Sequence, residues 1–263
     1  MRRAVTWRLT VLLAVTASAC GSSAAPASSS QQASSPGGTA RPTPTPTLTT
    51  HCSDSAPCSI AAGTYVLGDG VVLPGLTMTI PAGGWHSPGN DPGGLSLVPP
   101  DKPHDLVAVW ADLTAVKSTG TGHGTVLASI GKTPDALVAW MTSNPDLTVV
   151  VPPAPATIGW GIRATSLVVG ASHSAHYGDP TCPSNPRCAD LFTNRALWGA
   201  NQFVGVVGDE EFRIYLAALT VSGQPQTLFV VLDAPTDAEL TQLSAEAAPI
   251  VNSLHLPADA ASS

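Results

Sequence analysis

Two histidines near a cysteine are the residues that most directly suggest chemistry. His173 and His176 stand in the segment SHSAHYGDPTC, and Cys182 closes it. Imidazole and thiolate groups are ligands for zinc and copper. The spacing matches no standard zinc motif, so His173 and His176 are only weak candidates for a metal site. The sequence predicts an exposed loop here, and no metal or other cofactor.

The remaining catalytic motifs are incomplete. GKT at 131–133 resembles the end of a phosphate-binding loop, but the glycine that this motif needs five residues earlier is Val126. A Gly-x-Ser-x-Gly nucleophile elbow is missing from the sequence. Asp209, Glu210 and Glu211 are consecutive, and nothing in the local sequence would bury one of them and raise its pKa. We interpret them as a solvated hairpin tip and predict no catalytic residue and no enzyme.

The first twenty residues suggest export and lipidation. Arginines precede an apolar run of only a few residues, and small residues follow it. This order is typical of a secretory signal peptide, whereas a membrane span needs about 20 apolar residues. The end of the run, ASACG, resembles the bacterial lipobox, in which the cysteine thiol is acylated, for example with palmitate. We predict a signal peptide at 1–19 and a lipidated Cys20, with a plain Ala-x-Ala cleavage site and twin-arginine export as alternatives.

Composition divides the rest of the chain. Residues 20–50 are rich in Ser, Ala, Thr and Pro and offer little to bury, so they predict a disordered stalk, which glycans could modify. Residues 51–257 can form one globular domain, and 258–263 read as a disordered tail. The formal charge is −7, and the chain has no run of basic residues, which excludes a nucleic-acid partner. The expected contact with the membrane is the lipid anchor.

Four cysteines remain if Cys20 is acylated, and an exported protein is expected to oxidise them. Five turn-forming residues separate Cys52 from Cys58, and another five separate Cys182 from Cys188. We predict these two local disulfides. The rival pairing, which joins the N-terminal pair to the 182–188 loop, stays open.

Tryptophans are the other residues that could bind a ligand. A sugar-binding platform would need several of them exposed on one face. Trp85 and Trp110 fall in or beside apolar runs, which predicts core packing, whereas Trp160 lies on a predicted turn, TIGWG, and is expected to be exposed.

Two helices and a series of strands are predicted to position these residues. Thr133 caps a helix that starts at Pro134 and ends before Pro145, and Thr236 with Glu239 forms a capping box for a second helix, which Pro249 should kink or close. Strands are predicted at 75–80, 94–99, 106–112, 147–151, 161–169, 201–207, 211–221, 227–233 and 253–256. Hairpin-linked strands with two amphipathic helices indicate an α+β fold, a mostly antiparallel sheet with helices packed on its faces.

Parts of this pattern resemble known families. The runs GTYV, LTMTIPAGGW and PGGLSLVPP, within 63–100, resemble an actinobacterial extracytoplasmic domain of unknown function. The C-terminal run ELTQLSAEAAPIVNSLHL is similar to the closing helix and strand of PsbP-like domains, which include mycobacterial Lpq-type lipoproteins. The resemblance implies a sheet between helices and an extracytoplasmic location, and it carries no reaction.

Together these features predict a lipoprotein on the extracytoplasmic face of the cell membrane. We expect a non-catalytic binding or interaction module of the cell envelope, whose ligand is a protein, a glycan or a lipid. The alternatives are an accessory subunit of an envelope complex and an envelope enzyme.

Overall fold

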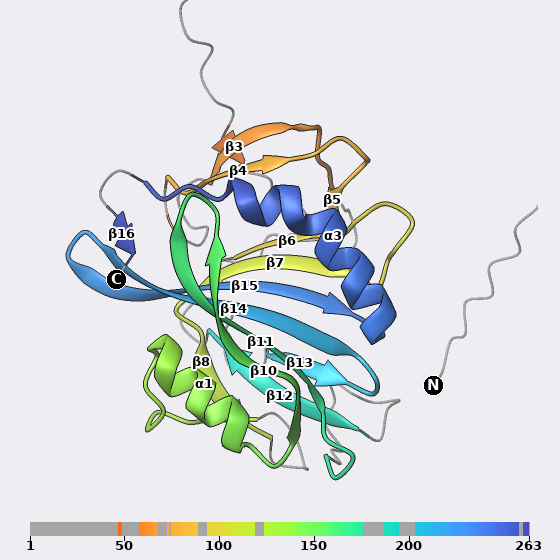
Figure 1. The fold of residues 1–263 in the computed structure, drawn as a ribbon, viewed down its shortest axis with the longest axis vertical. Coiled ribbons are helices and arrows are strands. Elements are labelled where there is room, and N and C mark those ends of the chain that lie inside the picture. Colours follow the sequence, from red (N-terminus) through yellow and green to blue (C-terminus); the bar gives the residue numbers. More distant parts are fainter. Residues whose placement is uncertain are drawn as a thin grey trace, which may run out of the picture. The chain divides into compact units, whose positions relative to one another are not determined.

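A seven-stranded antiparallel sheet dominates the part of the chain that the computed structural model describes, residues 47–48, 58–67, 73, 75–88, 94–118, 124–175, 187–194, 203–257 and 260–262. Six of its strands lie in the spatial order β10 (Leu147–Ile158), β11 (Ile162–Ala171), β14 (Glu211–Val221), β15 (Gln224–Ala234), β7 (Leu106–Ala111), β6 (Gly94–Leu97). The seventh, β16 (Ala260–Ser262), pairs with the end of β14 that β11 leaves free (Figure 1). The predicted antiparallel sheet is therefore confirmed.

Three smaller sheets complete the strand structure of the described residues. The largest has the order β13 (Val204–Val207), β12 (Cys188–Thr193), β8 (Thr114–Lys117), β9 (Thr125–Val126), and we call it the second sheet. Another joins β1 (Thr47–Leu48), β3 (Gly63–Leu67) and β4 (Thr77–Ile80), with β1 parallel to β3. The last pairs β2 (Cys58–Ser59) with β5 (His86–Ser87).

Both predicted helices start where their capping residues place them. Helix α1 spans Pro134–Ser143, and the Thr133 hydroxyl accepts a hydrogen bond from the Ala136 amide. Helix α3 spans Asp237–Ser253, and the Thr236 hydroxyl accepts from the Glu239 amide at 3.3 Å. That hydroxyl also donates to the Glu239 carboxylate at 2.9 Å, so the capping residues contact each other as the sequence suggests.

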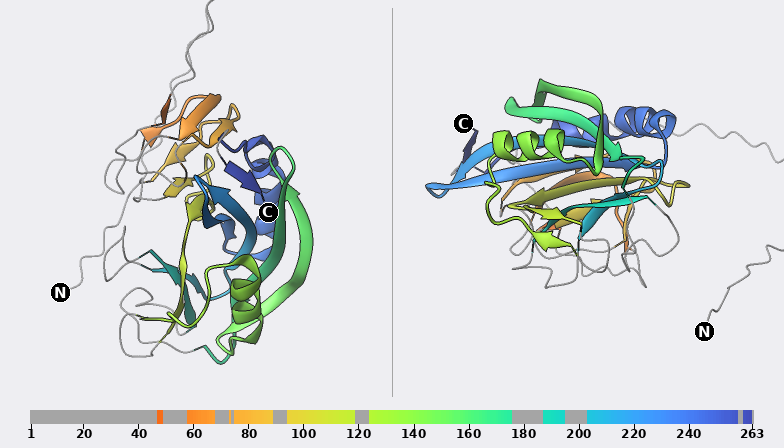
Figure 2. Two further views of the ribbon diagram at one scale, coloured as in Figure 1. Left: turned by 90° about the vertical axis from the view of Figure 1, so that its left-hand side faces the viewer. Right: turned by 90° about the horizontal axis from the view of Figure 1, so that it is seen from below.

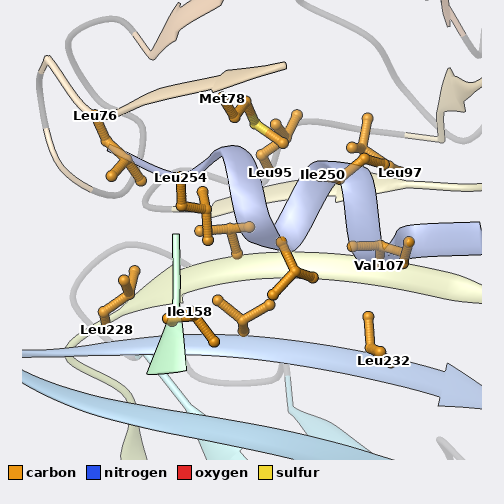
Figure 3. Close-up of a cluster of buried hydrophobic side chains, with 14 of the residues drawn as sticks. Leu76, Met78, Leu95, Leu97, Val107, Ile158, Leu228, Leu232, Ile250 and Leu254 are labelled. Atoms are coloured by element: carbon orange, nitrogen blue, oxygen red, sulfur yellow. The ribbon is translucent and has the colours of Figure 1, made fainter. Parts of the chain in front are cut away.

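Alternate side chains of the central sheet enter two separate cores. One set packs with α3 and with β4, and it includes Val107, Leu228 and Leu232 (Figure 3). Figure 3 shows Ile250 and Leu254 of the α3 segment beside Met78 and Leu95 in this cluster. Since side chains of a strand alternate between its two faces, the intervening residues are left for a different partner.

The second core joins α1 and the second sheet to the other set of side chains. Trp140 of α1 meets Phe192 of β12 edge to face with ring centroids 5.7 Å apart, and Phe192 meets Phe229 of β15 at 5.2 Å. Leu137 and Met141 of α1 are fully buried in the same cluster. This core fixes the position of α1 on the sheet, and α1 forms one wall of the groove described below.

The hairpin of β10 and β11 is strongly curved, and β10 is longer than predicted. Strand β10 continues from Val151 to Ile158 through three prolines, and its register with β11 shifts between Val149 and Ala154. Such bulges bend a strand, and the hairpin is strongly curved in Figure 2. The prediction ended this strand too early because proline is rare in central strands, whereas β10 lies at the edge of the sheet.

The C-terminal predictions need correction. Pro249 does not close α3, which continues to Ser253. The segment 253–256 is not a strand, since only His255 forms a single bridge, to Thr77. The predicted disordered tail 258–263 instead contains β16, whose pairing with Leu219–Val221 gives these residues a hydrogen-bonded partner. Local composition could not reveal that partner, because it lies about forty residues earlier in the chain.

The boundary between stalk and domain also moves. Thr47 and Leu48, inside the predicted stalk at 20–50, form β1 and pair with Val66 and Leu67.

Candidate functional site

A groove beside the start of α1 is the candidate site. Two hollows of about 440 Å³ and 400 Å³ adjoin there, and both are lined by Thr133, Pro134 and Ala218. Ligand pockets in proteins commonly have volumes in this range. We call these two hollows together the α1 groove.

The sheet forms the floor of the α1 groove. Leu216, Ala218 and Thr220 are alternate residues of β14, so their side chains share one face, and all three line the hollows. Thr165 of β11 lies opposite Leu216 and continues the same face, together with Arg163. The floor is therefore mixed, with apolar, hydroxyl and guanidinium groups.

Hydrogen bonds fix the loop that leads into α1. Thr227 of β15 donates through its hydroxyl to the Lys132 carbonyl, and the Lys132 ammonium donates to the Asp112 carbonyl at 3.1 Å. Two further hydrogen bonds join Asp112 directly to Thr227. The Asp112 carboxylate accepts from the Thr227 amide at 3.2 Å, and the Asp112 amide donates to the Thr227 carbonyl at 3.0 Å. These bonds join the loop before α1 to β15, and Asp112 has a left-handed conformation, φ 54°.

The charges of the α1 groove balance. Lys132 and Arg163 line it together with Asp112 and Asp135. Within the described part of the chain, neither Lys132 nor Arg163 forms an ion pair. Two cations, two carboxylates and several threonine hydroxyls suit a polar ligand that is uncharged or zwitterionic, because such a ligand can satisfy donors and acceptors without adding net charge.

His173, the first metal candidate, faces an arginine. Its Nδ1 lies 3.3 Å from Nη1 of Arg187, whose guanidinium also forms an ion pair with Asp209. His176 and Cys182 lie outside the described residues. In the described ranges no group of three or more His, Cys, Asp or Glu side chains is arranged to hold a metal ion.

Of the four cysteines predicted to form disulfides, the structure describes Cys58 and Cys188. Cys52 and Cys182 lie outside the described residues, so the pairing of the four stays a prediction.

The acidic run at 209–211 is not the uniformly solvated tip that we expected. Asp209 is exposed and paired with Arg187, but Glu210 and Glu211 are half-buried. Burial raises the pKa of the Glu210 carboxyl, whose Oε2 accepts from the Val207 amide at 2.9 Å. Burial also raises the pKa of Glu211, and the nearby Asp237 adds to this effect. The interpretation was wrong because the burying residues come from other strands.

Sequence reasoning missed the partners of Glu210. Asp233 on β15 shares a side-chain hydrogen bond with it, and burial raises the pKa of Asp233 well above its ordinary value. Asp105, just before β7, is 3% exposed, and burial raises its pKa too. The sequence does contain one sign of a buried carboxylate, since Asp233 ends the apolar strand TLFVVLD. None of these three residues lines the α1 groove.

The predicted burial of Trp85 and Trp110 and the predicted exposure of Trp160 are confirmed. Trp85, Trp110 and Trp140 are at most 7% exposed, while Trp160 is 76% exposed. Trp198 lies outside the described residues. The Trp160 amide donates to the Leu254 carbonyl at 3.0 Å, and its ring meets His255 edge to face at 4.7 Å. The turn therefore presents one exposed tryptophan, and the other described tryptophans are buried and form no exposed platform with it.

Cys20, the predicted signal peptide and most of the predicted stalk lie outside the described residues. Among the described helices, none has the length and the apolar composition needed to cross a bilayer.

Comparison with known proteins adds no relative: no family model matches the chain, and no curated protein sequence matches it significantly.

Proposed function

We propose that this chain is an exported lipoprotein, anchored through Cys20 to the extracytoplasmic face of the cell membrane, whose domain is a non-catalytic binding module of the cell envelope. The leader sequence supports the location, since a charged start, a short apolar run and ASACG precede a low-complexity segment. We also propose that the fold is PsbP-like. The antiparallel sheet, with one helix against each of its two cores, supports this assignment.

The α1 groove is the observation that carries the binding role. It is preformed, because Thr227 and Asp112 fix its wall and β14 forms its floor. Ligand sites are typically concave and largely preformed, with a few polar groups that orient the ligand. The balanced charges and the threonines favour a hydroxylated or zwitterionic envelope molecule, such as a peptidoglycan fragment or a lipid headgroup.

Trp160 favours a second role, that of an accessory subunit which docks on an envelope complex. Tryptophan is among the side chains that contribute most to protein–protein binding, and a fixed side chain loses little entropy on binding. The two roles use separate surfaces, because Trp160 does not line the groove.

Blocking the groove tests the first role. Ala218 lies on the floor of both hollows, so Ala218→Trp should fill the space where they meet. We expect saturable binding of solubilised peptidoglycan fragments, or of vesicles made from the envelope lipids, to the full chain in calorimetric titrations. Ala218→Trp should weaken it at least about tenfold, equivalent to roughly 1.4 kcal/mol.

Ala245→Trp is the matched control, since Ala245 is an exposed alanine on α3, outside the α1 groove. It should bind like the native chain. Arg163→Ala offers a second test that leaves the hollows open. If neither probe binds, or if Ala218→Trp binds as the native chain does, the groove is not the binding site.

A further inference from the structure

Three carboxylates lie at one end of three neighbouring strands. Glu210 directly precedes β14, Asp233 is the last residue but one of β15, and Asp105 directly precedes β7. The strands are adjacent in the sheet, and Asp233 is in register with Phe212 on one side and Leu106 on the other. Residues more than a hundred positions apart in the sequence therefore meet at this edge.

Their burial leaves oxygen atoms without hydrogen bonds. Among the described residues, neither Asp233 Oδ1 nor Asp105 Oδ2 has a hydrogen-bond partner, and both atoms are inaccessible. The nearest cation to Asp105, the Lys102 ammonium, is 3.9 Å from Oδ2 and closer, at 2.8 Å, to Glu246 of α3. A buried carboxylate with so little compensation is costly, which favours the protonated form.

The contact between Glu210 and Asp233 itself requires a proton. Two carboxylates are both acceptors, so a hydrogen bond between them forms only when one carries a hydrogen. Burial raises the pKa of both carboxyls, and it raises that of Asp233 well above its ordinary value, so we place the proton on Asp233. Glu210 then accepts from Asp233 and from the Val207 amide.

The surrounding charges are mostly negative. The segment before β7 contributes Lys102, His104 and Asp105, and α3 contributes Glu239 and Glu246. His104 and Lys102 stabilise negative charge, and the acids oppose it. Glu211 of β14 interacts electrostatically with Asp237, which opposes its negative charge, and with Arg213, which stabilises it. No cation among these described residues reaches the Glu210–Asp233 pair within ion-pair distance.

The turn that carries Glu210 joins the central sheet to the second sheet. It connects β13 to β14, and its Gly208 amide donates to the Arg187 carbonyl at 2.9 Å. Asp209 binds the Arg187 side chain, which also contacts His173. Arg187 directly precedes β12, so the turn holds the start of this strand.

We propose that the contact between Glu210 and Asp233 forms only when the pair carries a proton. This contact holds the β13–β14 turn, and with it the second sheet, against the end of the central sheet. Loss of the proton replaces a hydrogen bond with two carboxylates facing each other, and the turn separates from β15. In an exported protein, this contact would make the second sheet respond to the pH of the surroundings.

The direction of the pH effect follows from linkage. The raised pKa of Asp233 means that the folded chain keeps a proton that the unfolded chain has already lost. Between the unfolded-state and folded-state pKa values the free energy of unfolding falls as the pH rises, so the stabilisation is complete only below the ordinary value of 3.8 and is lost as the pH approaches the raised pKa. Asp105 and Glu211 act in the same direction.

Asp233→Asn tests the proposal, because an amide donates the same hydrogen bond at every pH. In thermal unfolding of the full chain between about pH 5 and pH 8, the native Tm should fall as the pH rises. Asp233→Asn should reduce that fall by roughly half or more, and Glu210→Gln should do the same. Asp101→Asn, in an exposed left-handed position that asparagine tolerates, should leave the fall unchanged.

Hydrogen exchange locates the effect. After correction for the intrinsic rate, the amides of residues 204–211 should be less protected at pH 8 than at pH 5 in the native chain, and equally protected in Asp233→Asn. A native Tm that rises with pH, an unchanged fall in both variants, or equal protection of 204–211 at the two pH values would overturn the proposal.

Discussion

Gly159 shows how one residue fixes the exposed turn between β10 and β11. Its amide donates to the Val251 carbonyl at 3.0 Å, and its φ is +51°. A Cβ atom at this position would lie 2.0 Å from the Leu254 carbonyl oxygen. The turn therefore rests directly on the end of α3, and this contact holds Trp160 in place.

Gly159→Ala should lower the free energy of unfolding by about 2–4 kcal/mol, because it adds a backbone clash to an unfavourable φ. Gly161→Ala is the matched control: its φ is +81°, but nothing lies within 4 Å of the added Cβ, so only the backbone cost of about 1–2 kcal/mol remains. Urea unfolding of both variants measures the difference. Equal losses would show that the turn does not depend on its contact with Leu254.

At the scale of elements, β10 presents an unusual edge. It is the outer strand of the central sheet, and most of its middle is exposed, including Val150 at 41% and Val151 at 45%. An exposed apolar edge strand can pair with another chain. Pro152, Pro153 and Pro155 lack the amide hydrogens that such pairing needs. We interpret the prolines as protection against sheet extension.

Replacing Pro152, Pro153 and Pro155 together by threonine should therefore increase self-association, since threonine restores three amide donors and favours strands. Sedimentation velocity over a range of concentrations would detect the larger species. Pro103 is exposed and lies outside the strands, so Pro103→Thr is the control and should sediment like the native chain. If the triple variant sediments like the native chain, the prolines have no such role.

At the scale of the whole molecule, the proposed function depends on the anchor. Cys20→Ser removes the thiol that would be acylated, and each buried CH₂ of an acyl chain contributes about 0.8 kcal/mol to membrane binding. In detergent phase separation, the native chain should enter the detergent phase, and Cys20→Ser should enter the aqueous phase or remain an unprocessed precursor. Ser22→Ala is the control and should partition like the native chain. A native chain found in the aqueous phase would contradict the lipoprotein prediction.

The sequence alone determined the features that depend on neighbouring residues. The starts of α1 and α3 follow from Thr133, Pro134 and Thr236, because capping acts within one helical turn. Strand β14 has the predicted bounds, because apolar and polar residues alternate along it as they do on the buried and exposed faces of a strand. The exposure of Trp160 follows from the turn composition around it.

Tertiary structure decided the rest. The α1 groove needs β11, β14, β15 and the α1 loop together, and no local pattern states which strands become neighbours. The run at 209–211 is predicted to be solvated, but Glu210 is half-buried because other parts of the fold cover the end of the sheet. Strand β16 exists because β14 extends beyond β11 and leaves backbone groups to pair. In each case the energy comes from contacts between distant segments, which the local composition of either segment does not record.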